Sequence, residues 1–139
     1  MKPLLGLLLF CAATSAAANQ AAPPQPQDEP HAYIISPRDG ETVGNPVKVI
    51  FGLSGMGIAP AGIEKEQTGH HHLLVDTPIP PADQPIPADA NHIHFGKGQT
   101  ETTLELPPGK HTLQLLIGDH AHMQHKPPVV SERITITVK

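Results

Sequence analysis

The feature that most constrains the fold is a series of short stretches in which apolar and polar residues alternate. Residues 47–53 and 134–138 each carry a large apolar side chain at every second position. A period of two places those side chains on one face of a β-strand. No stretch has the 3.6-residue period of an amphipathic helix, and only Pro60–Gln67 is compatible with a short helical turn. The sequence therefore predicts an all-β domain.

Turn signals separate these stretches. Further strands are predicted at 32–36, 70–76, 92–95, 102–106 and 113–117, with proline- and glycine-containing turns at 37–40 and 107–110. Residues 77–90 contain five prolines, which predicts an extended loop and not a strand. About seven strands at regular spacing predict an antiparallel β-sandwich of immunoglobulin type.

The N-terminus has the three parts of a secretory signal. Lys2 is followed by the apolar run Leu4–Phe10 and by the small residues of Cys11–Ala18. Residues 1–18 are predicted to be a signal peptide, 19–30 a flexible Pro/Gln/Ala linker and 31–139 the folded domain. The apolar run is shorter than the roughly 20 residues that a membrane span needs, and no later segment approaches that length. We expect a periplasmic or secreted protein without a membrane span.

Removal of the signal changes the charge and the cysteine content. Lys2 is lost, which leaves 8 basic against 13 acidic residues and argues against a nucleic-acid partner. The one cysteine, Cys11, is also lost, so the domain has no disulfide and no thiolate ligand. All 10 histidines remain. The histidines are thus the residues to consider for metal chemistry.

Eight of the histidines belong to three groups, and each group contains a His-x-His unit. On a strand, residues i and i+2 share a face with Cα atoms about 6.7 Å apart, so both imidazoles can reach one metal ion. Three or four nitrogens would complete such a site. The candidate ligands are His70, His72, His92, His94, His120, His122 and His125.

Neighbouring apolar residues indicate which face some of these histidines occupy. The apolar residues at 93 and 95 require the core, so His92 and His94 are expected to point away from it. His70 and His72 are the favoured outward pair of the first group, although Leu74 shares their face. The third group lies in or beside a loop, where periodicity decides nothing.

Imidazole donors without thiolate suit copper and zinc. Copper is the first choice, because nitrogen sites favour the divalent copper ion, and zinc is next. Met56 and Met123 are candidate thioether contacts to Cu(I). Asp76 or Asp119 is a candidate carboxylate to orient a histidine. The simpler alternative is that each is a solvent-exposed carboxylate in a turn. We expect a metal carrier, buffer or chaperone and not an enzyme.

Three alternatives stay open at this point. The chain is alternatively an interaction module of the cell envelope, with another envelope protein as its partner and structural histidines. A pH-sensing surface is a further possibility, since imidazole titrates near 6.5. A metal-dependent enzyme would need a general base, for which Glu64 or Glu66 is the nearest loop carboxylate to the first group.

Four strings carry a resemblance that spans Ile34–Val138: GHHHLLVD, HIHFGKGQTE, PGKHTLQLLIGDHAH and PPVVSERITITV. Together they resemble a bacterial family of exported, immunoglobulin-like domains of unknown function. The resemblance implies export and the sandwich fold, and it brings no established activity. The histidines that recur in that family correspond here to His70, His71, His72, His94, His120 and His122.

Overall fold

The computed structural model describes residues 29–139. The predicted signal peptide and all but the last two residues of the predicted linker lie outside this range. The described residues contain no helix, and therefore no helix long and apolar enough to cross a membrane. The described part contains nine strands: β1 (His31–Ser36), β2 (Thr42–Val43), β3 (Val47–Ser54), β4 (Gly57–Ile58), β5 (Thr68–Val75), β6 (His92–His94), β7 (Glu101–Leu104), β8 (Gly109–Gly118) and β9 (Ile134–Val138).

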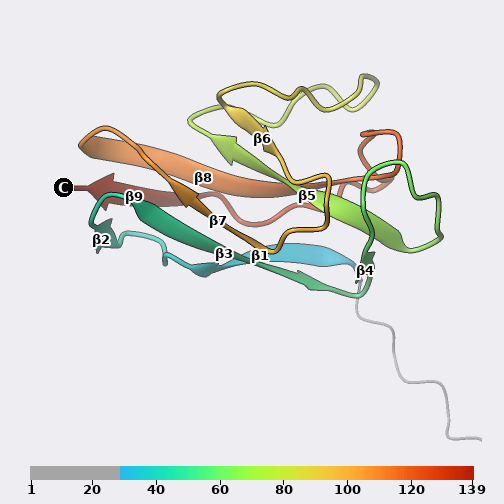
Figure 1. Ribbon diagram of the computed structural model, residues 1–139, viewed down its shortest axis with the longest axis horizontal. Coiled ribbons are helices and arrows are strands. Elements are labelled where there is room, and N and C mark those ends of the chain that lie inside the picture. The colour runs from blue at the N-terminus through green and yellow to red at the C-terminus, as the bar shows by residue number, and fades with distance from the viewer. Residues whose placement is uncertain (1–28) are drawn as a thin grey trace, which may run out of the picture.

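The strands form two sheets, as Figure 1 shows. The smaller has the order β1-β3-β7, and the larger has the order β2-β9-β8-β5-β4, with β6 also paired to β5. The pairs β2–β9 and β4–β5 are parallel and the other pairs are antiparallel. The predicted all-β sandwich is confirmed, while the immunoglobulin-type strand order stays a prediction. Residues 60–67, the one stretch compatible with a short helical turn, form no helix: the segment is irregular, with a tight turn in which Ile63 N–H donates to Pro60 O at 3.2 Å.

The main core lies between the two sheets and follows the alternation in the sequence. Strand β3 buries its residues 47, 49 and 51, and β9 buries 134, 136 and 138. Leu113, Leu115 and Ile117 of β8 are fully buried on the same side. Each such side chain removed from water contributes roughly 1.5–3 kcal/mol, so this layer supplies much of the driving force for folding.

A second, smaller core covers the opposite face of the larger sheet. Leu74 of β5 and Leu116 of β8 pack there against Ile86 and Val130. Ile86 belongs to the proline-rich loop between β5 and β6, which lies on the side of the larger sheet turned away from β1 (Figure 1). Because of this cover, β5 is buried on both faces from Gly69 to Val75.

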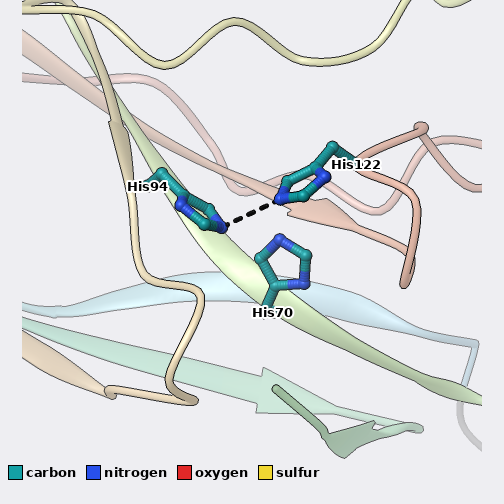
Figure 2. Close-up of side chains that lie close together, drawn as sticks. All are labelled: His70, His94 and His122. Carbon is teal, nitrogen blue, oxygen red and sulfur yellow. Dashed lines mark hydrogen bonds between the residues drawn. The ribbon is translucent and has the colours of Figure 1, made fainter. Parts of the chain in front are cut away.

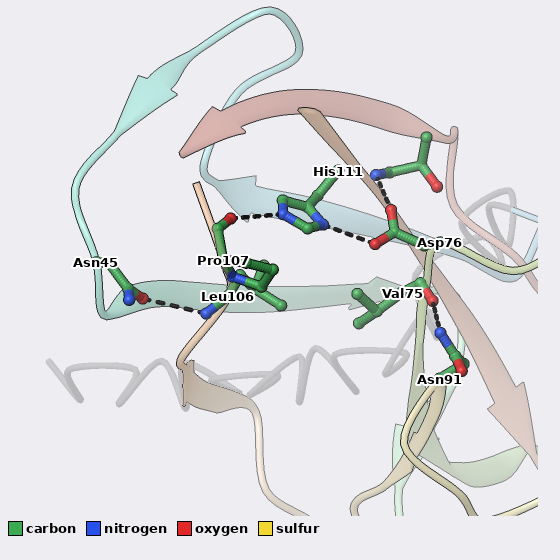
Figure 3. A network of polar contacts seen from close by, with 8 residues as sticks. Asn45, Val75, Asp76, Asn91, Leu106, Pro107 and His111 are labelled. Atoms are coloured by element: carbon green, nitrogen blue, oxygen red, sulfur yellow. Dashed lines mark hydrogen bonds and ion pairs between the residues drawn. The ribbon is translucent and has the colours of Figure 1, made fainter. Parts of the chain in front are cut away.

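A polar network fixes the end of β5 next to β8 (Figure 3). Asp76 accepts hydrogen bonds from Thr112 N–H at 2.7 Å and from His111 Nδ1 at 2.6 Å. The second ring nitrogen of His111 donates to Pro107 O at 2.8 Å. Both nitrogens thus face oxygen acceptors, and the Asp76 carboxylate together with Pro107 O raises the pKa of His111. Asp76 therefore orients His111 and none of the grouped histidines.

Candidate metal centre

Four imidazoles meet on the outer face of the larger sheet, under the loops that cover it. His70 and His72 are two residues apart on β5 and share a face, as the His-x-His spacing predicts. His94 of β6 lies directly opposite His72 in the antiparallel register. His122 enters from the loop that follows β8. We call His70, His72, His94 and His122 the four-histidine cluster.

Ring nitrogens of His70, His94 and His122 are close enough to one another to share one ion. The Nε2 atoms of His70 and His72 are 3.1 Å apart, and those of His94 and His122 are 3.2 Å apart. One ring nitrogen each from His70, His94 and His122 lies within 4.8 Å of the other two. Figure 2 shows a nitrogen of His70 pointing between the rings of His94 and His122. Each close pair is a hydrogen bond when one of its rings carries the Nε2 proton.

Asp119 shapes the loop that delivers His122. One oxygen of its carboxylate accepts hydrogen bonds from Ala121 N–H and Met123 N–H, both at 2.8 Å. The backbone N–H of His122 donates to Asp119 O at 3.0 Å, and His122 itself has a left-handed φ of 64°. Such a φ is unfavourable for a residue with a Cβ and is retained only where surrounding contacts fix it. Asp119 therefore positions His122 through the backbone and not through a hydrogen bond to its ring.

Two glycines make room for the rings. A Cβ added at Gly96 would lie 2.3 Å from Cε1 of His94, and one added at Gly118 would lie 2.9 Å from Nε2 of His72. Neither distance is possible for real atoms, so the rings occupy space that a side chain would fill. We did not predict either residue as part of the site. The signal for Gly96 is its position two residues after His94.

The cluster is buried unevenly. His70 and His72 have 0% of their surface exposed, whereas His94 and His122 are half-buried. Burial lowers the pKa of His70 to about 4 and that of His72 to about 3, and the neighbouring imidazoles add to the effect. Burial, and then His122, also lowers the pKa of His94. These rings are therefore neutral at pH 7 and offer lone pairs to a metal ion.

Some buried nitrogens of these rings have no partner. The Nδ1 atoms of His70 and His72 are buried without a hydrogen bond. Unpaired buried polar atoms are uncommon in folded proteins and call for an explanation, and a bound ion or water is one such explanation. His70 and His72 point away from the main core, as expected. They are nevertheless not exposed to solvent, because the loops cover them.

The other predicted ligands lie outside the cluster. His92 shares the face of Leu74, and its Nδ1 is 2.9 Å from Asp89 Oδ1. His120 is half-buried in the loop after β8, where its carbonyl accepts a hydrogen bond from Gly62 N–H at 3.0 Å. The structure thus brings together four of the seven candidate histidines.

His125 is the third candidate outside the cluster. It lines a surface pocket of about 570 Å³ together with Met56, and its Nε2 is buried without a partner. That nitrogen lies 3.0 Å from where a Cβ of Gly69 would be, on the face of β5 opposite to the cluster.

His71 occupies the main core. Its ring centre lies 5.1 Å from that of Phe51, and only 1% of the residue is exposed. Burial lowers the pKa of His71, and the nearby backbone of Gly52 and Gln99 raises it in part. Neither ring nitrogen makes a hydrogen bond of good geometry. His71 therefore faces away from the cluster and belongs to the interior of the sandwich.

The fold and the cluster together define a β-sandwich domain with an outer-face histidine site. Residues 49–139 match the family described as Domain of unknown function (DUF4399), which covers more than half of the chain. The chain belongs to this family, as the resemblance implied, while the recurring histidine pattern stays an expectation. No curated protein and no solved structure gives a significant match.

Proposed function

We propose that this chain is an exported protein that binds one transition-metal ion through His70, His94 and His122 and serves as a carrier, buffer or chaperone for it. The observation that carries the proposal is the meeting of three ring nitrogens, from three separate segments, within 4.8 Å of one another. A chance meeting of imidazoles at one point is costly, because His70 loses its contact with water and His94 and His122 lose part of theirs.

The spacing suits a metal ion. With metal–nitrogen bonds of about 2.0–2.1 Å, two ligand nitrogens on one ion are about 3.0–3.4 Å apart. The Nε2 atoms of His94 and His122 are already 3.2 Å apart. An all-imidazole donor set supports copper first and zinc next, in line with the ligand preferences of these ions.

The uneven burial supports a carrier and not an enzyme. The ring of His70 lies deep, where it holds the ion, and His94 and His122 lie at the half-exposed rim, where an incoming ligand can reach it. We propose that another envelope protein exchanges the ion at this rim. The sequence of residues 1–18 supports export to the periplasm or beyond.

Metal analysis of untagged protein purified from the periplasm tests this function, followed by Cu(I), Cu(II) and Zn(II) titrations. His94→Ala and His122→Ala are the informative variants, because both rings are half-buried and their loss leaves the main core intact. His120→Ala is the matched control in the same loop. We expect one ion per wild-type chain and per control, with binding to each cluster variant weakened at least about tenfold.

The contrary result is equally clear. If the wild type, the control and both cluster variants take up every ion equally weakly, the histidines are structural and the protein is not a carrier. In that case a chelator should also leave the unfolding temperature unchanged, as an envelope interaction module predicts.

A further inference from the structure

The cluster has a specific three-dimensional arrangement. Five of the six distances between its ring centres lie between 4.8 and 5.1 Å, and the sixth, from His72 to His122, is 6.0 Å. Four rings at the corners of a square with these sides would have two diagonals of about 7 Å, as a tetragonal site requires. Nearly equal distances instead describe the corners of a tetrahedron.

The size of this tetrahedron matches that of a metal complex. An imidazole centre lies about 1.2 Å beyond its ligating nitrogen, so four rings on a tetrahedral ion with bonds of about 2.0–2.1 Å have centres about 5.2 Å apart. The observed distances bracket this value. His72 is the fourth corner of this tetrahedron, and its Nε2 is 3.1 Å from that of His70. Its ring nitrogens fall outside the group of three that lie within 4.8 Å of one another, so the ring must turn toward His122 to join the ion.

We infer that His72 is the fourth ligand, so that the centre is a closed tetrahedral site of four imidazoles that selects the d¹⁰ ions Zn(II) and Cu(I). This inference rests on the proposed function and narrows it. Cu(II) prefers tetragonal surroundings, whereas Zn(II), with a filled d shell, accepts a tetrahedron without loss. Four protein ligands also leave no position for water, which separates the site from those of catalytic zinc enzymes.

The surrounding residues keep the four rings in this tetrahedral arrangement. His72 lies between β8 and β6, opposite Leu116 on one side and His94 on the other. Gly118 gives its ring space, and Ile86 closes the same region, with Cδ1 3.1 Å from where a Gly118 Cβ would be. Because the backbone on both sides of His72 is hydrogen-bonded in the sheet, its Cα is held in place before any ion arrives, and rotation of the side chain alone would bring the ring onto the ion.

Cobalt substitution and X-ray absorption test the inference on the wild-type protein. We expect the zinc-loaded protein to give four nitrogen neighbours with imidazole scattering, and the Co(II)-loaded protein to give the intense visible bands of a tetrahedral ion. Addition of azide should leave the wild-type Co(II) spectrum unchanged. In His72→Ala the azide should change the spectrum, because a position has opened, and zinc should bind at least about tenfold more weakly.

The outcomes separate the two proposals. Three nitrogens with one oxygen in the wild type, or a wild-type cobalt spectrum that responds to azide, would overturn the closed site and leave the proposed function standing. If none of Zn(II), Cu(I) and Cu(II) binds, both fail, and if Cu(II) alone binds, only the closed site fails. Competition between Zn(II) and anaerobic Cu(I) for wild-type protein then identifies which of the two ions the site prefers.

Discussion

Replacing Gly96 with alanine should remove His94 from the four-histidine cluster without unfolding the sheet. The new Cβ would lie 2.3 Å from Cε1 and 2.6 Å from Nε2 of His94, and 3.3 Å from Cβ of Ala61. Ordinary contact begins near 3.4 Å, so the imidazole must retreat by about 1 Å, roughly five times the 0.2 Å tolerance of a metal–ligand bond. The ring can make this movement by rotating its side chain, so the main cost falls on metal binding.

The magnitude follows from the loss of one well-placed ligand. Disturbing the surroundings of a ligand typically weakens metal affinity by about 10–100-fold, or about 1.4–2.7 kcal/mol. Zinc affinity should be measured by competition with a chromogenic chelator at fixed pH and ionic strength. The unfolding temperature with and without zinc gives a second readout, because an ion bound only to the folded state stabilises it.

Gly44→Ala is the matched control for this substitution. A Cβ at Gly44 meets nothing within 4 Å, so the variant tests the change from glycine to alanine alone. We expect it to bind zinc as the wild type does. Equal zinc affinity in Gly96→Ala and Gly44→Ala would refute the assignment of His94 as a ligand held over Gly96.

Further predictions concern Asp119 in the loop after β8, His111 beside Asp76, and Leu113 in the main core. Asp119→Ala should weaken zinc binding about tenfold by releasing the turn that carries His122; unchanged affinity would contradict the positioning role. In metal-free protein the raised pKa of His111 stabilises the fold fully below pH 6.5, and this contribution should disappear as pH rises through the raised value. Urea titrations across this range should therefore show the wild type losing its advantage over His111→Gln, and a constant difference would count against the Asp76 contact. Leu113→Ala should lower the free energy of unfolding by about 2–5 kcal/mol at unchanged zinc affinity; a loss below about 1 kcal/mol would disprove tight packing at this position.

Local sequence patterns were enough to predict seven of the nine strands in the described residues, all but the two-residue β2 and β4, and part of the site. The alternation at 47–53 and 134–138 places the expected residues in the main core. The His-x-His rule places His70 and His72 on one face, and the apolar residues beside His94 indicate that it points away from the core. These predictions succeed because a strand fixes the direction of each side chain within two residues.

The rest of the site depends on contacts that no local pattern encodes. His122 joins the cluster because Asp119 bonds its loop into a turn with a left-handed residue, while His125, three residues later, turns to the other face of β5. His70 and His72 are buried because the proline-rich loop folds back over them, and that long-range packing is invisible to periodicity. His92 shows the converse: it has the right spacing but contacts Asp89.

The cluster draws its rings from three places along the chain, and the segment between His94 and His122 alone spans 28 positions. An ion at this point would tie together parts of the chain that are remote in sequence, much as a disulfide does in other exported domains of this size. Residues 29–139 contain no cysteine, so coordination would provide the one such covalent-like crosslink open to them. The metal-loaded domain should then resist proteolysis at the proline-rich loop of residues 77–90, which lies between the cluster residues His72 and His94. It should become sensitive to the protease again when the ion is transferred to a partner.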